Sequence, residues 1–272
     1  MLSEPRRPPL WRTARRLLSR GSGLIAVVCF IGLWQWYGSS YAHASFLFSR
    51  PSTVASSFAH VVGNMQLPRA FADSVAEEAV GFAIAAALAI GVGALMGRVR
   101  YVEFALDPLV TIGIATPVIV LLPVMENWFG FGSTSRVAFI VVLSVWPILI
   151  NTWSGIATMG AAYHLVGRSL GLGRLQQLRM IILPAAAPYI FAGLRLGLAN
   201  ATLAMVVAGQ EVGDAGLGGL TEIYGQQGEV GQLIAVILSS TALALLLFWL
   251  LRVVERRGFS WIAATGAGGA GA

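Results

Sequence analysis

The residues able to do chemistry are few, and their spacing matches no common catalytic site. All 18 basic residues are arginines, so the lysine of a GxxxxGK[ST] phosphate-binding loop has no counterpart. The histidines, His43, His60 and His164, lie far apart, and neither HExxH nor GxSxG occurs. Cys29 is the single cysteine, which excludes an intrachain disulfide and a multi-cysteine metal site. We therefore expect a non-enzyme that needs no metal or other cofactor.

A second set of polar residues lies in or just beyond apolar sequence. Its members are Asn200, Thr202, Gln210 and Glu211. Because polar side chains are costly to expose to lipid, they are candidates to line a translocation path. The alternative is that the amides bond to neighbouring helices and that Glu211 faces water. Sequence alone leaves both interpretations open.

A third set of residues lies in the segment 167–188, "GRSLGLGRLQQLRMIILPAAAP". Its leucines have near-helical spacing, which predicts a short cationic helix with Leu170, Leu175, Leu178 and Ile182 on one face. Such a helix lies on a lipid surface or inserts into a groove of another protein. Gly171 and Gly173 permit a turn or a close backbone approach. We expect Pro184 to end this element and Pro188 to begin the next span.

Composition indicates that these residues belong to a membrane protein. The chain is 57% hydrophobic and 11% charged, whereas soluble domains are about 25% charged. Six apolar segments approach the length of about 20 residues that a spanning helix needs. They are 24–38, 79–97, 108–125, 137–153, 189–208 and 231–251. The expected fold is an all-α polytopic membrane protein with about six transmembrane helices.

Residues within these spans indicate how the helices pack. Pro117, Pro123 and Pro147 should kink their helices, either to shape a path or to fit neighbouring helices. Gly93 and Gly97 form a small-xxx-small pair that favours close helix contact.

The arginines predict the orientation in the membrane. With the N-terminus inside, the segments 1–23, 98–103, 158–182 and the tail after 251 are cytoplasmic and hold most arginines. This bias towards the inside also explains the net charge of +6 without nucleic acid as a partner. Arg195 lies near the cytoplasmic end of the fifth span, where it can snorkel or form an ion pair. Asp73, Glu77 and Glu78, on the outer side, should face water.

The N-terminal region allows two interpretations. An arginine-rich start, an apolar run and "AHA" at 42–44 are typical of a secretory signal. However, the run contains Trp34, Trp36 and Tyr37 and leads into a membrane domain, so we expect its retention; cleavage would leave five spans. The segment 49–64 predicts a short interfacial helix beginning near Pro51.

Gly167–Ala201 resembles the EAA-loop signature of binding-protein-dependent ABC transporter permeases. The matching positions are Gly171, Leu183, Pro184, Pro188, Gly193, Leu194 and Arg195. The resemblance extends over about residues 48–262 and includes "WFGFG", "WPILINTWSGI" and "GLGGL". The most similar branch is that of nitrate, aliphatic sulfonate, taurine and bicarbonate importers.

The sequence departs from the family pattern at three places. The opening Glu-Ala-Ala reads Leu165-Val166-Gly167, so the glutamate that helps to tie the loop to its partner is missing. The usual "PSP" reads "RPS" at 50–52. The acidic residue of the fifth helix aligns near Gly209, and Glu211 follows two positions later. These departures weaken any inference about the docking details and the solute.

The resemblance implies the type I importer permease fold in five parts. They are a basic cytoplasmic N-terminus at 1–23, a first transmembrane helix at 24–41, an outer interfacial segment at 42–72, a core permease domain at 73–258 and a flexible cytoplasmic tail at 259–272. The core includes a cytoplasmic coupling loop at about 158–182. The implied residues for ATPase coupling are Arg168, Gly171, Arg174, Leu175, Arg179, Leu183 and Pro184.

The resemblance also implies a function and a set of partners. The chain would be a permease of the bacterial inner membrane with both termini cytoplasmic, moving a small solute inward, with nitrate, sulfonate, taurine or a similar anion as candidates. Its partners would be ABC ATPase subunits, a periplasmic or lipid-anchored solute-binding protein and a second permease copy in a homodimer. The alternatives are a self-contained channel or secondary transporter and, more weakly, a membrane scaffold without transport.

Overall fold

The computed structural model describes residues 10–40, 49–212 and 216–258, and every regular element in these ranges is a helix. The elements are α1 (Leu10–Ser40), α2 (Pro51–Gly63), α3 (Gln66–Arg98), α4 (Arg100–Ala115), the 3-10 helix η2 (Val118–Leu121), α5 (Leu122–Phe129), α6 (Ser133–Ser169), α7 (Arg174–Gln177), the π-helix η3 (Leu178–Ile182), α8 (Leu183–Val212), α9 (Gly216–Gln226) and α10 (Val230–Gly258). The predicted all-α class is confirmed for these residues. The tail at 259–272 and the "AHA" string lie outside them.

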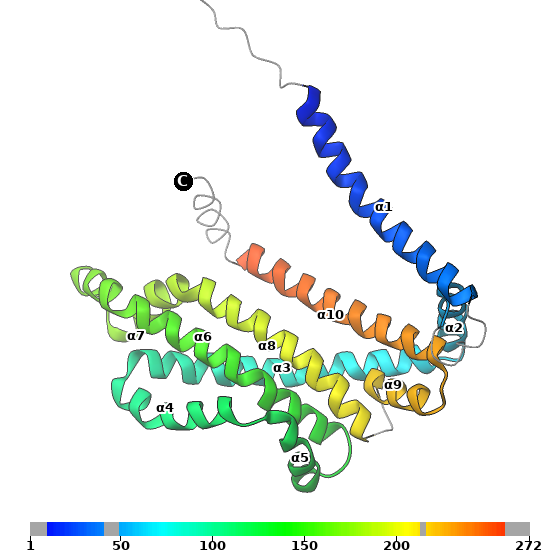
Figure 1. Cartoon of the computed structure of the whole chain (residues 1–272). Coiled ribbons are helices and arrows are strands. Elements are labelled where there is room, and N and C mark those ends of the chain that lie inside the picture. Colours follow the sequence, from blue (N-terminus) through cyan, green and yellow to red (C-terminus); the bar gives the residue numbers. More distant parts are fainter. Residues whose placement is uncertain (1–9, 41–48, 213–215, 259–272) are drawn as a thin grey trace, which may run out of the picture.

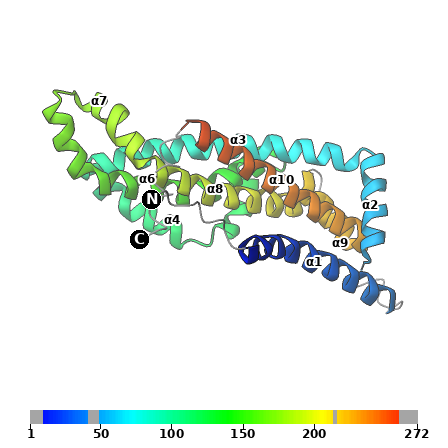
Figure 2. The same cartoon turned by 90° about the horizontal axis from the view of Figure 1, so that it is seen from above.

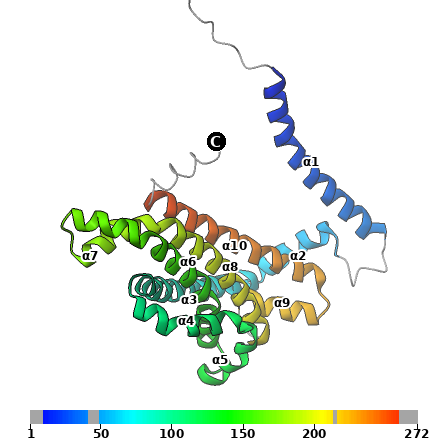
Figure 3. The same cartoon turned by 60° about the vertical axis from the view of Figure 1, so that its left-hand side comes forward.

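The centre of the bundle is formed by α3, α6 and α8. Helix α6 packs against both α3 and α8, and α10 lies along α8 (Figures 1 and 2). We call the two ends of the bundle the α7 end and the α9 end. Helix α1 stands away from this bundle and contacts it mainly through α2 (Figure 3).

Small residues allow the central helices to approach closely. A Cβ atom added to Gly93 would lie 2.9 Å from the Leu149 carbonyl oxygen, and one added to Gly97 would lie 2.8 Å from Ile156. The same is true of Gly81, where an added Cβ would lie 2.6 Å from Ile140. The predicted packing role of Gly93 and Gly97 is therefore confirmed, and α6 is the partner helix.

The number of long spans differs from the expectation of six. Four described helical segments are long and apolar enough to cross a membrane: Gln66–Arg98, Ser133–Met159, Leu175–Glu211 and Val230–Gly258. A fifth span arises if α4 and the bent continuation at 118–129 are taken together. The apolar part of α1, Ile25–Ser40, is shorter than these. Many of the leucines and isoleucines on the outside of the bundle are exposed, as expected of a surface that contacts lipid.

The third predicted span, 108–125, is not one continuous helix. The chain bends by 93° between Arg100–Ala115 and Val118–Phe129. Pro117 has no N–H to donate to the Gly113 carbonyl and its ring would clash with that oxygen. Thr116, the residue before the proline, accordingly leaves the helical region with φ −73° and ψ 126°.

The short helix predicted within 49–64 is confirmed as α2, and its interfacial location stays a prediction. Pro51 occupies its first turn, and Arg50 rather than Ser49 is the N-cap residue. The next helix begins at Gln66, so the expected boundary at 72/73 falls within α3. The division into five parts stays a prediction.

Candidate functional site: the turn between α6 and α8

The segment predicted to be a cationic helix forms a tight turn followed by helix. Helix α6 ends at Ser169, and the chain reverses before α7 begins at Arg174. Gly171 has φ +69°, and no atom of this chain lies within 4 Å of a Cβ added there. Of the two roles expected for this glycine, the turn is therefore the one found within the chain.

Two glutamines hold this turn together. The side chain of Gln177 is buried, and its Nε2 donates to the Leu172 carbonyl at 2.8 Å. It also lies so close to Gly167 that a Cβ added there would be 2.6 Å from Gln177 Cγ. Gln176 Oε1 accepts a hydrogen bond from the Gly173 N–H at 2.9 Å. Sequence reasoning missed both; the one available signal was a pair of amides directly after a glycine-rich turn.

The expectation that Pro184 ends the element is wrong. Residues Leu175–Glu211 form one continuous helical segment, and Pro188 lies inside α8 rather than at its start. The π-helix η3 directly precedes Pro184, and the Leu183 N–H bonds to the Leu178 carbonyl, five residues earlier. This wider turn makes room for a proline ring that a regular α-turn would press against the carbonyl of residue 180.

The predicted single apolar face is divided. Ile182 is buried and Leu178 half-buried, and both belong to a cluster with Ile156, Ala186 and Ile190. In contrast, Leu170, Leu175 and Met180 are 66%, 62% and 68% exposed. Three apolar side chains at the α7 end, Leu170, Leu175 and Met180, therefore remain uncovered, and we call them together the apolar tip.

The other residues predicted for coupling are Arg168, Arg174, Arg179, Leu183 and Pro184. Arg179 is exposed, and with Leu183 and Pro184 it lines a cavity of about 350 Å³ beside α8. The backbones of Arg168 and Arg174 belong to α6 and α7, but their side chains lie outside the described residues.

The candidate path residues contact three different partners instead of one common pocket. Asn200 Nδ2 donates to the Leu143 carbonyl at 3.2 Å, and Gln210 Nε2 donates to Thr221 Oγ1 at 3.2 Å. Thr202 bonds to Glu78, whereas Glu211 is exposed. The alternative of interhelical bonding thus accounts for the first three, and their role in a path stays a prediction.

The bond from Asn200 has a local cause in α6. Pro147 lacks the N–H that would normally bond to the Leu143 carbonyl, and Asn200 supplies the missing donor from α8. Asn200 also lines a cavity of about 240 Å³ with Gly113 and Val118, on the two sides of the bend after α4.

Two acidic residues expected to face water are buried. Arg136 binds Glu77 through both carboxylate oxygens, with Nε 3.0 Å from Oε1 and 2.9 Å from Oε2 and Nη2 2.6 Å from Oε1. Their side chains are 6% and 10% exposed. Glu78 is completely buried, so among the three acids only Asp73 is exposed as predicted. The reason is that α3 begins before the apolar run and carries both glutamates into the bundle.

Arg195 forms an ion pair that links α8 to α10. Its Nη2 lies 2.8 Å from Glu255 Oε1 of α10. The predicted pairing of this arginine is therefore confirmed.

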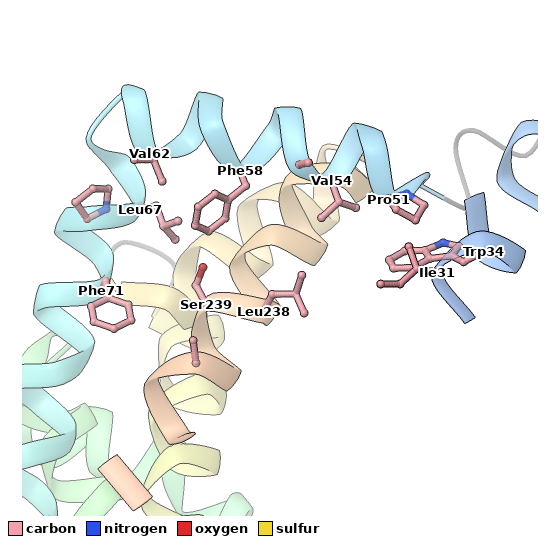
Figure 4. Close-up of a pocket in the computed structure, with 13 residues that line it drawn as sticks. Ile31, Trp34, Pro51, Val54, Phe58, Val62, Leu67, Phe71, Leu238 and Ser239 are labelled. Carbon is pink, nitrogen blue, oxygen red and sulfur yellow. The ribbon is translucent and has the colours of Figure 1, made fainter. Parts of the chain in front are cut away.

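A further cavity lies elsewhere, where α1, α2, α3 and α10 meet (Figure 4). It measures about 750 Å³, and α2 lies across it between Trp34 and Phe71. Ser239 is the one lining side chain with a hydroxyl group, and the indole N–H of Trp34 is bonded to the Ser49 carbonyl at 2.9 Å. The cavity has no charged lining residue and includes none of the residues predicted for coupling or for a translocation path.

Comparison with known families agrees with this arrangement of helices. The family described as "Binding-protein-dependent transport system inner membrane component" matches residues 80–259, which is more than half of the chain. The chain belongs to this family. As a member, it is a membrane-embedded transport permease, and the turn between α6 and α8 lies inside the matched region.

Named permeases are similar over much of the chain. A Bacillus subtilis protein named as an aliphatic sulfonates transport permease, SsuC, is 29% identical over 88% of this chain and 87% of its own length. The bicarbonate transport permease CmpB of Synechococcus elongatus is 34% identical over 67% and 68%. The nitrate import permease NrtB of Synechocystis is 36% identical, over 53% of each chain. The expected family and branch are confirmed.

Proposed function

We propose that this permease serves an ATP-driven importer and receives its motion from a separate ATPase through residues 167–183. The observation that carries the proposal is the apolar tip. Leu170 and Leu175 project from a turn braced by Gln177, so the chain exposes apolar side chains on a rigid support. Apolar side chains held in this way are suited to a groove on a partner protein.

Charge supports the cytoplasmic location of this tip. The α7 end carries Arg98, Arg100, Arg179, Arg252, Arg256 and Arg257, besides the arginines whose side chains are not described. Basic residues accumulate on the cytoplasmic side of membrane proteins. The α7 end therefore faces the cytoplasm, where a nucleotide-hydrolysing subunit works, and the α9 end faces a solute-binding protein outside.

A second permease copy completes the transporter in this proposal. One copy exposes large apolar side chains on α4, on α5 and in the loop after α5, including Phe104, Trp128 and Phe131. Helix α1 stands away from the bundle and does not cover these side chains, so they are free to contact a second copy. The homodimer, the binding protein and the ATPase remain parts of the proposal.

The solute in this proposal is a small anion. The support is the similarity to permeases named for sulfonates, nitrate and bicarbonate. Within the described spans, Arg136 and Arg195 are already engaged by glutamates, so neither offers a free charge to the solute. Selection of the solute would then depend chiefly on the solute-binding protein and on uncharged hydrogen-bond donors of the permease.

The test of the coupling proposal is a charge placed on the apolar tip. Leu175→Glu should abolish co-purification with the ATPase and ATP-driven uptake, because a carboxylate would have to enter an apolar groove. Val254→Glu is the matched control. Val254 is 59% exposed and lies near the C-terminal end of α10, which is also at the α7 end of the bundle. Normal uptake by Leu175→Glu would contradict the proposal. Flux through the permease reconstituted without an ATPase would instead favour a channel or a secondary transporter.

A further inference from the structure

Glu78 is a fully buried acid for which the coupling mechanism gives no role. It lies on α3 against α8, and its Oε1 is 2.5 Å from Thr202 Oγ1. Its other oxygen, Oε2, is buried without a hydrogen-bond partner among the described residues. A buried carboxyl group with one unbonded oxygen is costly if it is ionised.

No charged group of the described helices around α3 compensates Glu78. Arg136 of α6, the basic residue facing this part of α3, is bound by both oxygens of Glu77. On α8, Arg195 pairs with Glu255 at the α7 end, and Glu211 is exposed near the opposite end. The remaining ionisable groups with described side chains on the neighbouring helices are His60 of α2, Arg100, Tyr101, Glu103 and Asp107 of α4, Tyr163 of α6, Tyr189 of α8, Glu222 and Tyr224 of α9, and Arg252, Arg256 and Arg257 of α10. Among the described side chains, none of these is hydrogen-bonded or ion-paired to Glu78, whose one side-chain partner is Thr202.

The hydrogen bonds of Thr202 indicate where a proton is needed. Thr202 Oγ1 contacts Glu78 and also the Leu198 carbonyl, at 3.2 Å. A hydroxyl group has one hydrogen to donate. If Glu78 is protonated, it donates to Thr202 Oγ1, and Thr202 donates to Leu198. Oε2 is then the carbonyl oxygen of a neutral acid, which is far less costly to bury than part of a charge.

We propose that Glu78 is a positioning residue that holds a proton and fastens α8 to α3 through Thr202. The inference rests on the proposed function, because α8 is the helix continuous with the coupling segment. The hydrogen bond between protonated Glu78 and Thr202 keeps the outer half of α8 in place against α3 while the ATPase moves the α7 end. Loss of the proton leaves an unpaired charge at this contact and loosens it.

An infrared measurement reads the proton directly. The difference spectrum between wild-type permease and Glu78→Gln, both in lipid vesicles at neutral pH, should contain the carbonyl band of a protonated carboxylic acid. Glu126 has a buried carboxylate oxygen without a partner too, but it is present in both proteins and cancels. A difference spectrum with carboxylate bands alone would show that Thr202 donates to an ionised Glu78 and would overturn the inference.

The pH dependence of uptake tests whether loss of the Glu78 proton impairs transport. In vesicles with the complete importer, wild-type uptake should fall towards alkaline pH, because the buried acid loses its proton there. Glu78→Gln stays neutral and can still donate, so it should retain uptake and lose this alkaline decline. Glu78→Leu cannot bond to Thr202 and should reduce uptake by about tenfold, the effect of one lost hydrogen bond. Asp73→Asn, an exposed acid on the same helix, should keep the wild-type profile.

The two measurements separate the two hypotheses. An acid band together with no ATP-dependent uptake by the wild type would refute the importer function and leave the proton on Glu78 established. Normal uptake with an unchanged alkaline decline in Glu78→Gln would refute the role of Glu78 alone.

Discussion

At the scale of single residues, Gly171 and Gly173 look alike in the sequence but differ in the structure. Gly171 has a positive φ, whereas Gly173 does not. A side chain at a left-handed position costs about 1–2 kcal/mol. A substitution by alanine is therefore expected to strain the backbone at Gly171 but not at Gly173, although both lie in the same turn.

The turn should be open for a larger fraction of the time in Gly171→Ala than in Gly173→Ala. Hydrogen exchange of a peptide spanning 167–177 should become faster by at least about fivefold in Gly171→Ala, the factor that corresponds to roughly 1 kcal/mol. Gly173→Ala is the control, because the nearest atom to its added Cβ is Gln176 Oε1 at 3.5 Å. Equal exchange in both variants would contradict the assigned backbone role.

Several residues of the site could not have been found from the sequence. The coupling segment and its glycines were predicted, because helical spacing and turn residues are local signals. Gln177 was missed because its contact with Gly167 crosses the turn. Glu77 was assigned to water because its partner, Arg136, lies on another helix, and no local pattern links the two.

At the scale of elements, two prolines have opposite effects. Pro117 breaks its span, whereas α6 continues through Pro147. The difference is that Asn200 of α8 bonds to the carbonyl that Pro147 leaves free. The kink expected at Pro117 is therefore found. Sequence patterns identify a proline but not a donor that folding brings from another helix, and this is why the continuous helix through Pro147 could not be predicted.

This explanation predicts coupling between Pro147 and Asn200. Asn200→Ala alone should lower the free energy of unfolding by about 0.6–1.7 kcal/mol, the range for hydrogen bonds between membrane helices. In a Pro147→Ala background the cost should be smaller, because residue 147 then has its own N–H. A double-mutant cycle in detergent measures the difference, and additive effects would refute the explanation.

At the scale of the whole molecule, the orientation is open to a direct test. Cys29 is replaced by serine, and single cysteines are introduced at Leu175 and Phe131, which are 62% and 81% exposed and lie beyond opposite ends of α6. A membrane-impermeant maleimide should label position 131 in intact cells and position 175 only in inverted vesicles. The reverse pattern would place the apolar tip outside and exclude ATPase docking there.

The unbroken helical segment Leu175–Glu211 is longer than the hydrocarbon layer of a membrane is thick. Its 37 residues span about 55 Å at 1.5 Å per residue, whereas the hydrocarbon layer is about 30 Å thick. Even when tilted, such a rod is too long to be hidden in lipid, so part of it stands in water. In the proposed importer, the ATPase would contact this part of the helix in water and displace the helix along its axis.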